Sequence, residues 1–214
     1  MLNIIESKDN AKIKNAQKLA KDAKLRSETG VFFASTPKVV MDVLAAGFEA
    51  ESLFFTKEEY EKYSAKVADQ KVYIISEAVN QKLSEDKTSQ GVFGIFKMKT
   101  ADVDKIFAAD RLIILEDIQD PGNMGAIMRT ALAFGYEDIV VSTKCADIYS
   151  PKVLRSSMTA VLGTGCFYRG IKTLGLLLQH PGIFLIYCTV LHCLLAPQIV
   201  DLLIKAIVVA IRIA

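Results

Sequence analysis

The feature that most constrains the fold is a repeated alternation of short apolar runs with helical patterns, which begins at Val31. Short apolar runs predict strands, and they alternate with stretches whose apolar residues recur at helical spacing. The predicted strands lie at residues 31–34, 52–56, 71–76 and 91–98, and the predicted helices between them lie at residues 37–47, 57–68 and 77–84. This order is typical of a small α/β domain.

A second α/β unit follows a polar stretch. Residues 99–110 lack strand character and precede a new apolar strand at residues 111–115, so we interpret them as a linker. After that strand come a turn-rich segment, a helix at residues 124–134 that Gly135 ends, and a strand at residues 138–142. Such a βαβ unit predicts parallel strands and a right-handed crossover. The predicted divisions of the chain are 1–98, 99–110, 111–170 and 171–214.

Charge is distributed unevenly along the chain. The formal net charge of +2 is too small to indicate a nucleic-acid partner by itself, because such binding needs basic residues gathered on one surface. Residues 1–26 hold seven cations, Arg26 among them, against three carboxylates. We interpret this segment as a modest basic arm in which Lys14, Lys18 and Lys21 fall on one helical face.

The four cysteines and the N-terminus bear on the compartment. Cys145 stands alone, and Cys166, Cys188 and Cys193 have no paired spacing that would indicate a secreted disulfide framework. His192 beside two of these cysteines has metal-ligand chemistry, but accidental spacing in an apolar tail explains it better, and we predict no metal. The N-terminus has none of the features of a signal peptide. We therefore expect a cytoplasmic protein.

The composition changes abruptly after Gly170. Only four of the last 44 residues are charged, and the uncharged stretch from Thr173 to Val200 is long enough to span a bilayer. Three interpretations remain open. We favour a reading-frame change or truncation near residues 165–172; a membrane anchor is weakened by the prolines and polar residues of the stretch, and a divergent buried core is the third.

The most specific pattern is DPGNMGAIMRTALAFG at residues 120–135. Here a strand ends in a tight turn whose Gly122 and Gly125 allow close backbone approach, and Asn123 can cap the helix that follows. On a helical wheel the apolar residues share one face, and Arg129 points away from it toward a possible ligand. The structural alternative is a capping asparagine and an exposed helical arginine.

A second pattern is SPKVLRSSMTAVLG at residues 150–163, in which Lys152 and Arg155 precede a small-residue turn into a helix. Together the two segments resemble the first and second signature motifs of the SpoU family within the SPOUT methyltransferases. Thr159 stands where the family has glycine, and its branched side chain would obstruct close backbone packing. The structural alternative is a helix start with two solvated cations.

The N-terminal part adds an independent resemblance. Residues 7–33 and 75–96 resemble the substrate-binding domain that precedes the catalytic domain in many SpoU proteins, so the resemblance covers residues 3–165. That domain is thought to hold structured RNA, which suits the three lysines on one helical face; a solvated helix face is the alternative. At residues 34–36 the chain has Ala-Ser-Thr where relatives carry an acidic residue followed by glycine.

The resemblance implies an α/β fold: a small RNA-binding domain followed by a parallel-sheet SPOUT (α/β knot) methyltransferase domain, incomplete here. It implies methyl transfer from S-adenosyl-L-methionine to a ribose 2′-hydroxyl of rRNA or tRNA, and a homodimer. It implies catalytic roles for Asn123 and Arg129, which would hold the ribose or phosphate and stabilise the developing alkoxide, because a guanidinium rarely gives up its proton. The implied RNA-binding residues are Lys14, Lys18, Lys21, Lys152 and Arg155.

The cofactor-binding residues stay unassigned. No asparagine follows Asn123 and no glutamate follows Glu137, so neither the family's cofactor loop nor the asparagine of its third motif is present. The alternative functions are therefore an RNA-binding remnant without activity and a non-functional gene fragment. The chain has no Walker lysine and no Rossmann GxGxxG, and its glycines follow a strand rather than a helix, which disfavours phosphate-loop, dinucleotide and KH-type sites.

Overall fold

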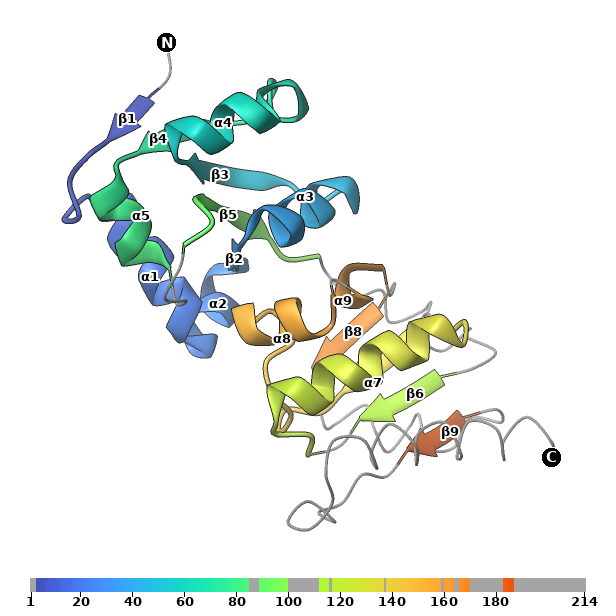
Figure 1. Cartoon of the computed structure of the whole chain (residues 1–214). Coiled ribbons are helices and arrows are strands. Elements are labelled where there is room, and N and C mark those ends of the chain that lie inside the picture. The colour runs from blue at the N-terminus through green and yellow to red at the C-terminus, as the bar shows by residue number, and fades with distance from the viewer. Residues whose placement is uncertain are drawn as a thin grey trace. The chain divides into compact units, whose positions relative to one another are not determined.

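The computed structural model describes residues 3–84, 89–99, 112–115, 117–136, 138–158, 160–163, 166–169 and 183–186 (Figure 1). The chain divides into two compact units, of which the first is Met1–Lys99 with Tyr149–Pro151 and the second is Thr100–Ile148 with Lys152–Ala214. Apart from Lys99, the predicted linker lies outside the described residues. So does the predicted tail, apart from one strand.

The first unit is a mixed five-stranded sheet with helices on both faces. The sheet order is β1-β4-β3-β5-β2, in which β1, β4 and β3 are parallel and β5 runs antiparallel to both of its neighbours. Its elements are β1 (Asn3–Ile5), α1 (Ala11–Lys21), α2 (Ala23–Thr29), β2 (Val31–Ser35), α3 (Pro37–Ala45), β3 (Ala50–Phe55), α4 (Lys57–Tyr63), a 3-10 helix (Ser64–Lys66), β4 (Val72–Ile75), α5 (Glu77–Leu83) and β5 (Val92–Lys97). The predicted alternation is confirmed, and β1 is an element that we did not predict.

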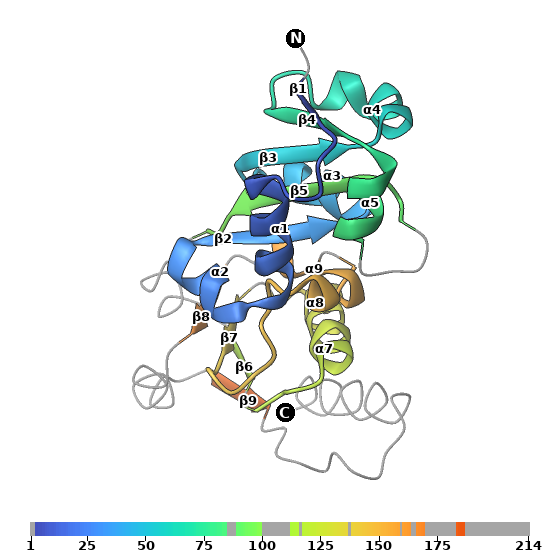
Figure 2. The ribbon, with the colours of Figure 1, turned by 90° about the vertical axis from the view of Figure 1, so that its left-hand side faces the viewer.

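The two faces of this sheet bury separate apolar layers, because successive side chains of a strand point to opposite faces. Helices α1, α2 and α5 cover the face that carries Phe33, Phe54 and Phe93, and α1 contributes its buried apolar stripe. Helices α3 and α4 cover the other face, where Phe32 stacks on Phe96. Figure 2 shows α1 in front of the sheet and α3 behind it. Burial of each such side chain contributes roughly 1.5–3 kcal/mol, which makes these layers the main stabilising term.

The N-terminal segment folds into two helices, and one of its predicted cations is buried. Helix α1 ends at Lys21, the side chain of Asp22 caps α2, and the guanidinium of Arg26 is buried between the two helices. It donates hydrogen bonds to the backbone carbonyls of Leu19 and Ala20, at the otherwise unpaired C-terminal end of α1. Because a buried cation cannot also contact RNA, Arg26 does not contribute to the exposed charge of the basic arm.

Thr36, which starts α3, has a backbone conformation that favours glycine, with φ 78° and ψ 144°. The resemblance places a glycine in relatives within this segment, so the departure has a structural cost. Backbone strain of this kind costs about 1–3 kcal/mol. We expect Thr36→Gly to raise the free energy of unfolding by about 1 kcal/mol, because glycine relieves the strain and also serves as a helix cap.

Urea denaturation followed by circular dichroism measures the effect. The control is Thr36→Ala, which keeps the Cβ and loses the hydroxyl that accepts from the Val39 N–H at 3.5 Å, and it should lower stability by about 1 kcal/mol. Equal effects of the two substitutions would contradict the role given to strain.

The second unit is built on a parallel sheet in the order β8-β7-β6-β9. Its elements are β6 (Leu112–Leu115), α7 (Pro121–Ala133), β7 (Asp138–Val141), α8 (Pro151–Ser156), α9 (Ala160–Gly163), β8 (Cys166–Arg169) and β9 (Ile183–Ile186). The parallel α/β domain that we predicted is confirmed. Nearly continuous apolar strands such as Ile113–Leu115, buried at 2% exposure or less, suit a sheet covered on both faces.

Strand β9 lies inside the apolar tail. It pairs in parallel with β6, and Ile113 is the partner of Phe184. These four residues therefore belong to the parallel sheet, and β6 is not left as an open edge. Among the described residues, no helix is long and apolar enough to cross a membrane.

Candidate functional site

Helix α7 starts three residues earlier than predicted. Asp120 is its N-cap, and the side-chain Oδ1 of Asp120 accepts a hydrogen bond from the backbone N–H of Asn123 at 2.8 Å. The prediction that Asn123 caps the helix is therefore wrong. Pro121 occupies the first helical position, where its fixed φ suits a helix and its missing N–H costs nothing. The half-buried side chain of Asn123 projects from the first turn instead.

The apolar face of α7 was predicted correctly. Met124, Ile127, Met128 and Ala131 are at most 3% exposed, whereas Arg129 is exposed. Within the described part of the chain, the guanidinium of Arg129 has no hydrogen bond or ion pair. A closed ion pair with a described residue would have ruled out ligand binding, so the predicted reach of Arg129 toward a ligand stays open.

The two sequence motifs meet at Gly125. The hydroxyl of Ser156, at the end of α8, donates a hydrogen bond to the backbone carbonyl of Pro121 at 2.8 Å. A Cβ on Gly125 would lie 2.2 Å from this hydroxyl oxygen and 2.6 Å from the backbone of Ser156 and Ser157. The close backbone approach that we predicted for Gly125 is confirmed. It places the helix that carries Asn123 against the segment that follows Arg155.

Lys152 and Arg155 lie on α8, in the same unit as Asn123 and Arg129. Lys152 is exposed and Arg155 is half-buried. After α8 the backbone reverses at Met158, which has a φ of 49° and is 57% exposed. Thr159, where we expected an obstruction, lies outside the described residues. The structure thus joins the two motifs, and their roles in binding stay predictions.

A network that sequence reasoning missed holds the loop ahead of α7. The N–H of Ile118 donates to Cys145 Sγ at 3.3 Å, and the thiol donates to the carbonyl of Leu115 at 3.4 Å. The N–H of Asp117 donates to Ser142 Oγ at 3.4 Å. These bonds join the loops at the carboxyl ends of β6 and β7, where open parallel sheets bind ligands. No sequence signal pairs these positions, because a lone buried cysteine gives no spacing pattern.

The three predicted RNA-binding lysines of α1 belong to the first unit. Lys14, Lys18 and Lys21 are all exposed, opposite the buried stripe that includes Ile13 and Leu19. Lys14 forms an ion pair with Asp9, with 2.9 Å between Nζ and Oδ1. The predicted helical face is confirmed as a surface, and RNA binding by it stays a prediction.

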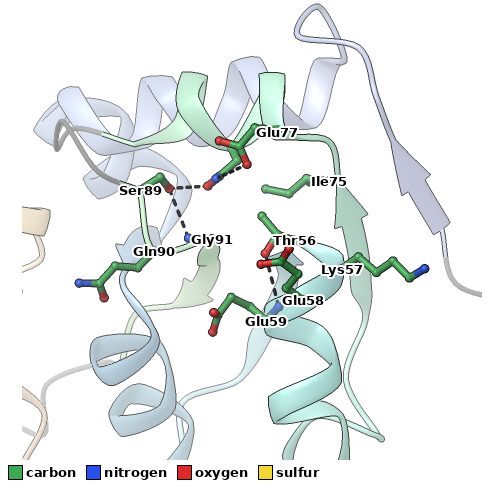
Figure 3. Close-up of a pocket in the computed structure, with 10 residues that line it drawn as sticks. Thr56, Lys57, Glu58, Glu59, Ile75, Glu77, Ser89, Gln90 and Gly91 are labelled. Atoms are coloured by element: carbon green, nitrogen blue, oxygen red, sulfur yellow. Dashed lines mark hydrogen bonds between the residues drawn. The ribbon is translucent and has the colours of Figure 1, made fainter.

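The first unit also has a pocket of about 360 Å³ between the N-terminal ends of α4 and α5 (Figure 3). Glu58, Glu59 and Glu77 line it together with Thr56, Lys57, Ile75, Asn80, Ser89, Gln90 and Gly91. The amide of Asn80 donates to Glu77 Oε2 at 3.0 Å and accepts from the hydroxyl of Ser89. None of the predicted site residues lines this pocket. Its carboxylates repel phosphate groups, so it is not the surface on which we expect the RNA backbone.

The described residues contain no group of three or more His, Cys, Asp or Glu side chains arranged to hold a metal ion. Cys188, His192 and Cys193 lie outside the described residues. Cys145 is a free, buried cysteine. Beyond Arg169, only Ile183–Ile186 of the segment that the family match covers are described. We therefore assign no cofactor-binding residue.

Profiles of two families match the chain. One, described as the MRM3-like substrate binding domain, matches residues 10–94, and the other, described as the SpoU rRNA Methylase family, matches residues 110–189. The second match runs past residues 165–172, where we placed the end of the resemblance, so that limit was wrong. Strand β9 lies within the matched range and belongs to the parallel sheet.

Two relatives illustrate the similarity. The mitochondrial rRNA methyltransferase 3 of Xenopus laevis is 31% identical over 150 residues, which are 66% of this chain and 36% of that protein. The 23S rRNA (guanosine(2553)-2′-O)-methyltransferase RlmP of Bacillus subtilis is 30% identical over 154 residues, which are 72% of this chain and 60% of that protein. The chain thus spans less than two thirds of the length of these relatives.

Solved structures have the same fold. A crystal structure of an rRNA methyltransferase from Sinorhizobium meliloti has a TM-score of 0.70 and 25% sequence identity, over 83% of this chain and 69% of that chain. An AdoMet-bound structure of an rRNA methyltransferase from the same organism has a TM-score of 0.68 and 25% identity, over 81% of this chain and 67% of that chain.

Proposed function

Because the chain belongs to the SpoU rRNA methylase family, we propose that it methylates RNA, with S-adenosylmethionine as the donor and a ribose 2′-hydroxyl of rRNA or tRNA as the acceptor. The relative from Bacillus subtilis, a 23S rRNA 2′-O-methyltransferase, supports the position of the methyl group. The AdoMet-bound Sinorhizobium structure supports the donor.

The observation that carries the proposal is the exposed Arg129 on a helix packed at Gly125 against the second motif. A ribose hydroxyl has to lose its proton as its oxygen attacks the methyl carbon, so negative charge develops on that oxygen. S-adenosylmethionine supplies the activated methyl group when it is bound. Arg129 keeps its own proton and would hold a phosphate or stabilise the developing alkoxide, and Asn123 would assist as a hydrogen-bond partner.

The lysines of α1 would hold the RNA backbone without reading its sequence. We expect the double variant Lys18→Ala/Lys21→Ala to weaken RNA binding at all sequences, because each lysine lost removes one phosphate contact. The slope of log affinity against log salt should become shallower by about 2. Fluorescence anisotropy over a salt series measures it. The control is Lys66→Ala, beyond α4 on the other face of the sheet; an equal loss there would contradict a localised surface.

The second candidate is an RNA-binding protein without methyltransferase activity. It is favoured by the missing asparagine and glutamate of the family's cofactor loop. In that case RNA affinity survives and no methyl group is transferred. A reading-frame change near residues 165–172 conflicts with the family match, which extends to residue 189, and resequencing the gene across codons 160–214 tests the remaining tail.

Two measurements separate the candidates. Calorimetry of the folded protein with S-adenosylmethionine tests the donor, and transfer of labelled methyl groups to rRNA and tRNA tests the reaction. Alkaline hydrolysis of the product shows whether the methyl group is on the ribose 2′-oxygen, because a 2′-O-methyl group blocks cleavage of the adjacent phosphodiester. We expect binding and an alkali-resistant product. If the folded protein binds RNA but does not bind S-adenosylmethionine, the result supports the second candidate, an RNA-binding protein without activity.

The predicted homodimer and cytoplasmic location stay proposals. Sedimentation of the purified protein tests the first, and fractionation of the source cells tests the second. Mitochondrial proteins are among the relatives, so the compartment does not follow from similarity.

A further inference from the structure

Helices α1 and α5 lie side by side on one face of the first unit (Figures 1 and 2). The side chain of Gln17 donates a hydrogen bond to the backbone carbonyl of Lys82 at 2.8 Å. The ammonium of Lys82 in turn donates to the backbone carbonyl of Lys8 at 2.9 Å. These two bonds fix Lys82 beside the loop that leads into α1, although Lys82 and Lys8 are 74 positions apart in the sequence.

Asp9, in the same loop, follows Lys8, whose carbonyl binds the ammonium of Lys82. Lys14 is its ion-pair partner at 2.9 Å, and both side chains are exposed, at 52% for Lys14 and 81% for Asp9. The hydrogen bond and charge of Lys14, followed by the charge of Lys82, lower the pKa of Asp9 below its ordinary value. The carboxylate is therefore paired with the ammonium of Lys14, and the ammonium of Lys82 is bound at the carbonyl of the residue before it.

We propose, on the basis of the proposed function, that Lys82 extends the RNA-binding surface of α1. In the free protein, Asp9 occupies the position beside Lys14 that a phosphate group of the bound RNA occupies in the complex. The surface then consists of Lys14, Lys18, Lys21 and Lys82, and we call it the α1–α5 lysine surface. Asp9 weakens RNA binding, because it has to be displaced from Lys14 and because its charge repels phosphate.

Phosphate suits this exchange chemically. An exposed ion pair such as Asp9–Lys14 is weak, since water solvates both groups, so its replacement costs little. A phosphate has several acceptor oxygens and can take hydrogen bonds from more than one ammonium group. One of the three N–H donors of the Lys82 ammonium binds the carbonyl of Lys8, and the others can bind a ligand. Release of condensed counterions from the RNA adds to the gain.

A purely structural role of Asp9 predicts a different effect of Asp9→Asn on RNA affinity. Asp9 precedes Asn10, the N-cap of α1, and a negative charge there favours the helix dipole. If this were its whole role, Asp9→Asn would lower thermal stability slightly and leave RNA affinity unchanged or reduced. If Asp9 instead competes with phosphate for Lys14, Asp9→Asn should raise the affinity for RNA. Affinity and stability then change in opposite directions in one variant.

The test uses the full chain and a fluorescein-labelled RNA hairpin in anisotropy titrations between about 50 and 200 mM salt. We expect Asp9→Asn to bind about three- to tenfold more tightly at low salt, with a slope steeper by about 0.9. Lys82→Gln, which keeps a donor for the Lys8 carbonyl, should bind about three- to tenfold more weakly, with a slope shallower by about 0.9. In a Lys14→Ala background, most of the gain from Asp9→Asn should disappear.

The matched control is Asp42→Asn. Asp42 also forms an ion pair with a lysine, Lys38, at 2.8 Å on α3, and its side chain is 35% exposed. A gain there equal to that of Asp9→Asn would show a general charge effect and overturn the proposal. Unchanged affinity in both Asp9→Asn and Lys82→Gln, with normal RNA binding by the unsubstituted protein, would also overturn it and leave the proposed function standing. Absence of RNA binding by the unsubstituted folded protein would overturn both.

Discussion

Replacing Arg129 by alanine should lower the rate of methyl transfer by about 10²- to 10³-fold, the loss that follows when one group that stabilises a developing oxyanion is removed. Arg129 is exposed on α7 and makes no hydrogen bond or ion pair within the described residues, so its loss should leave the thermal unfolding curve unchanged. RNA affinity should fall by less than about tenfold, because one phosphate contact among several is lost. Single-turnover rates with saturating RNA and S-adenosylmethionine measure the chemical step.

The control is Arg129→Lys, which keeps the charge and loses the planar fork of donors. We expect it to recover part of the rate, because lysine still offers a cation to the developing oxyanion but cannot bind two oxygens side by side. A fall in RNA affinity with an unchanged rate at saturation would contradict the assignment. In that case Arg129 contributes to binding in the ground state rather than to the reaction.

Replacing Gly125 by alanine should lower the free energy of unfolding of the second unit by about 3 kcal/mol, at the upper end of the cost of overpacking. Two of the three close contacts of the added Cβ, both at 2.6 Å, are with the backbone of Ser156 and Ser157, which cannot rotate away as a side chain could. To relieve the clash, α7 and the end of α8 have to separate. Chemical denaturation measures the loss of stability, and the methyl-transfer rate should fall with it.

Gly122→Ala is the matched control within the same helix. A Cβ there would lie 2.9 Å from Asp120 Oδ1 and 3.9 Å from Asp120 Cγ, two atoms of the same side chain. Because a side-chain oxygen can shift, we expect a cost below about 1 kcal/mol. Losses of equal size at Gly122 and Gly125 would show that the helix start itself, and not its contact with Ser156, is sensitive to added volume.

Local patterns were enough to predict most elements of both units. The apolar run Val31–Ser35 and the periodic segment Pro37–Ala45 formed the strand and helix that their spacing predicted. The exposure of Arg129 also followed from the helical wheel. These features depend on residues close in sequence, which is why a pattern of apolar spacing predicts them.

Features that depend on distant residues were missed or misplaced. Strand β1 is three residues long with Ile4 68% exposed, and its partner β4 lies about seventy residues away. Arg26 looked like a surface cation because the carbonyls that bury it belong to the preceding helix. The start of α7 was misplaced for another reason: Asp120 and Asn123 are equally good caps, and only the adjacent Pro121 distinguishes them.

The position of β9 has a consequence for synthesis of the protein. Its partner β6 leaves the ribosome about seventy residues earlier, and the pairing of Ile113 with Phe184 waits until that interval has been translated. During this time β6 offers unpaired backbone groups beside an apolar surface, which is the state of a nascent chain that favours pairing with other molecules. Premature termination between β8 and β9 should therefore yield aggregates that bind chaperones, in contrast to termination after Lys99, which follows a completed five-stranded sheet.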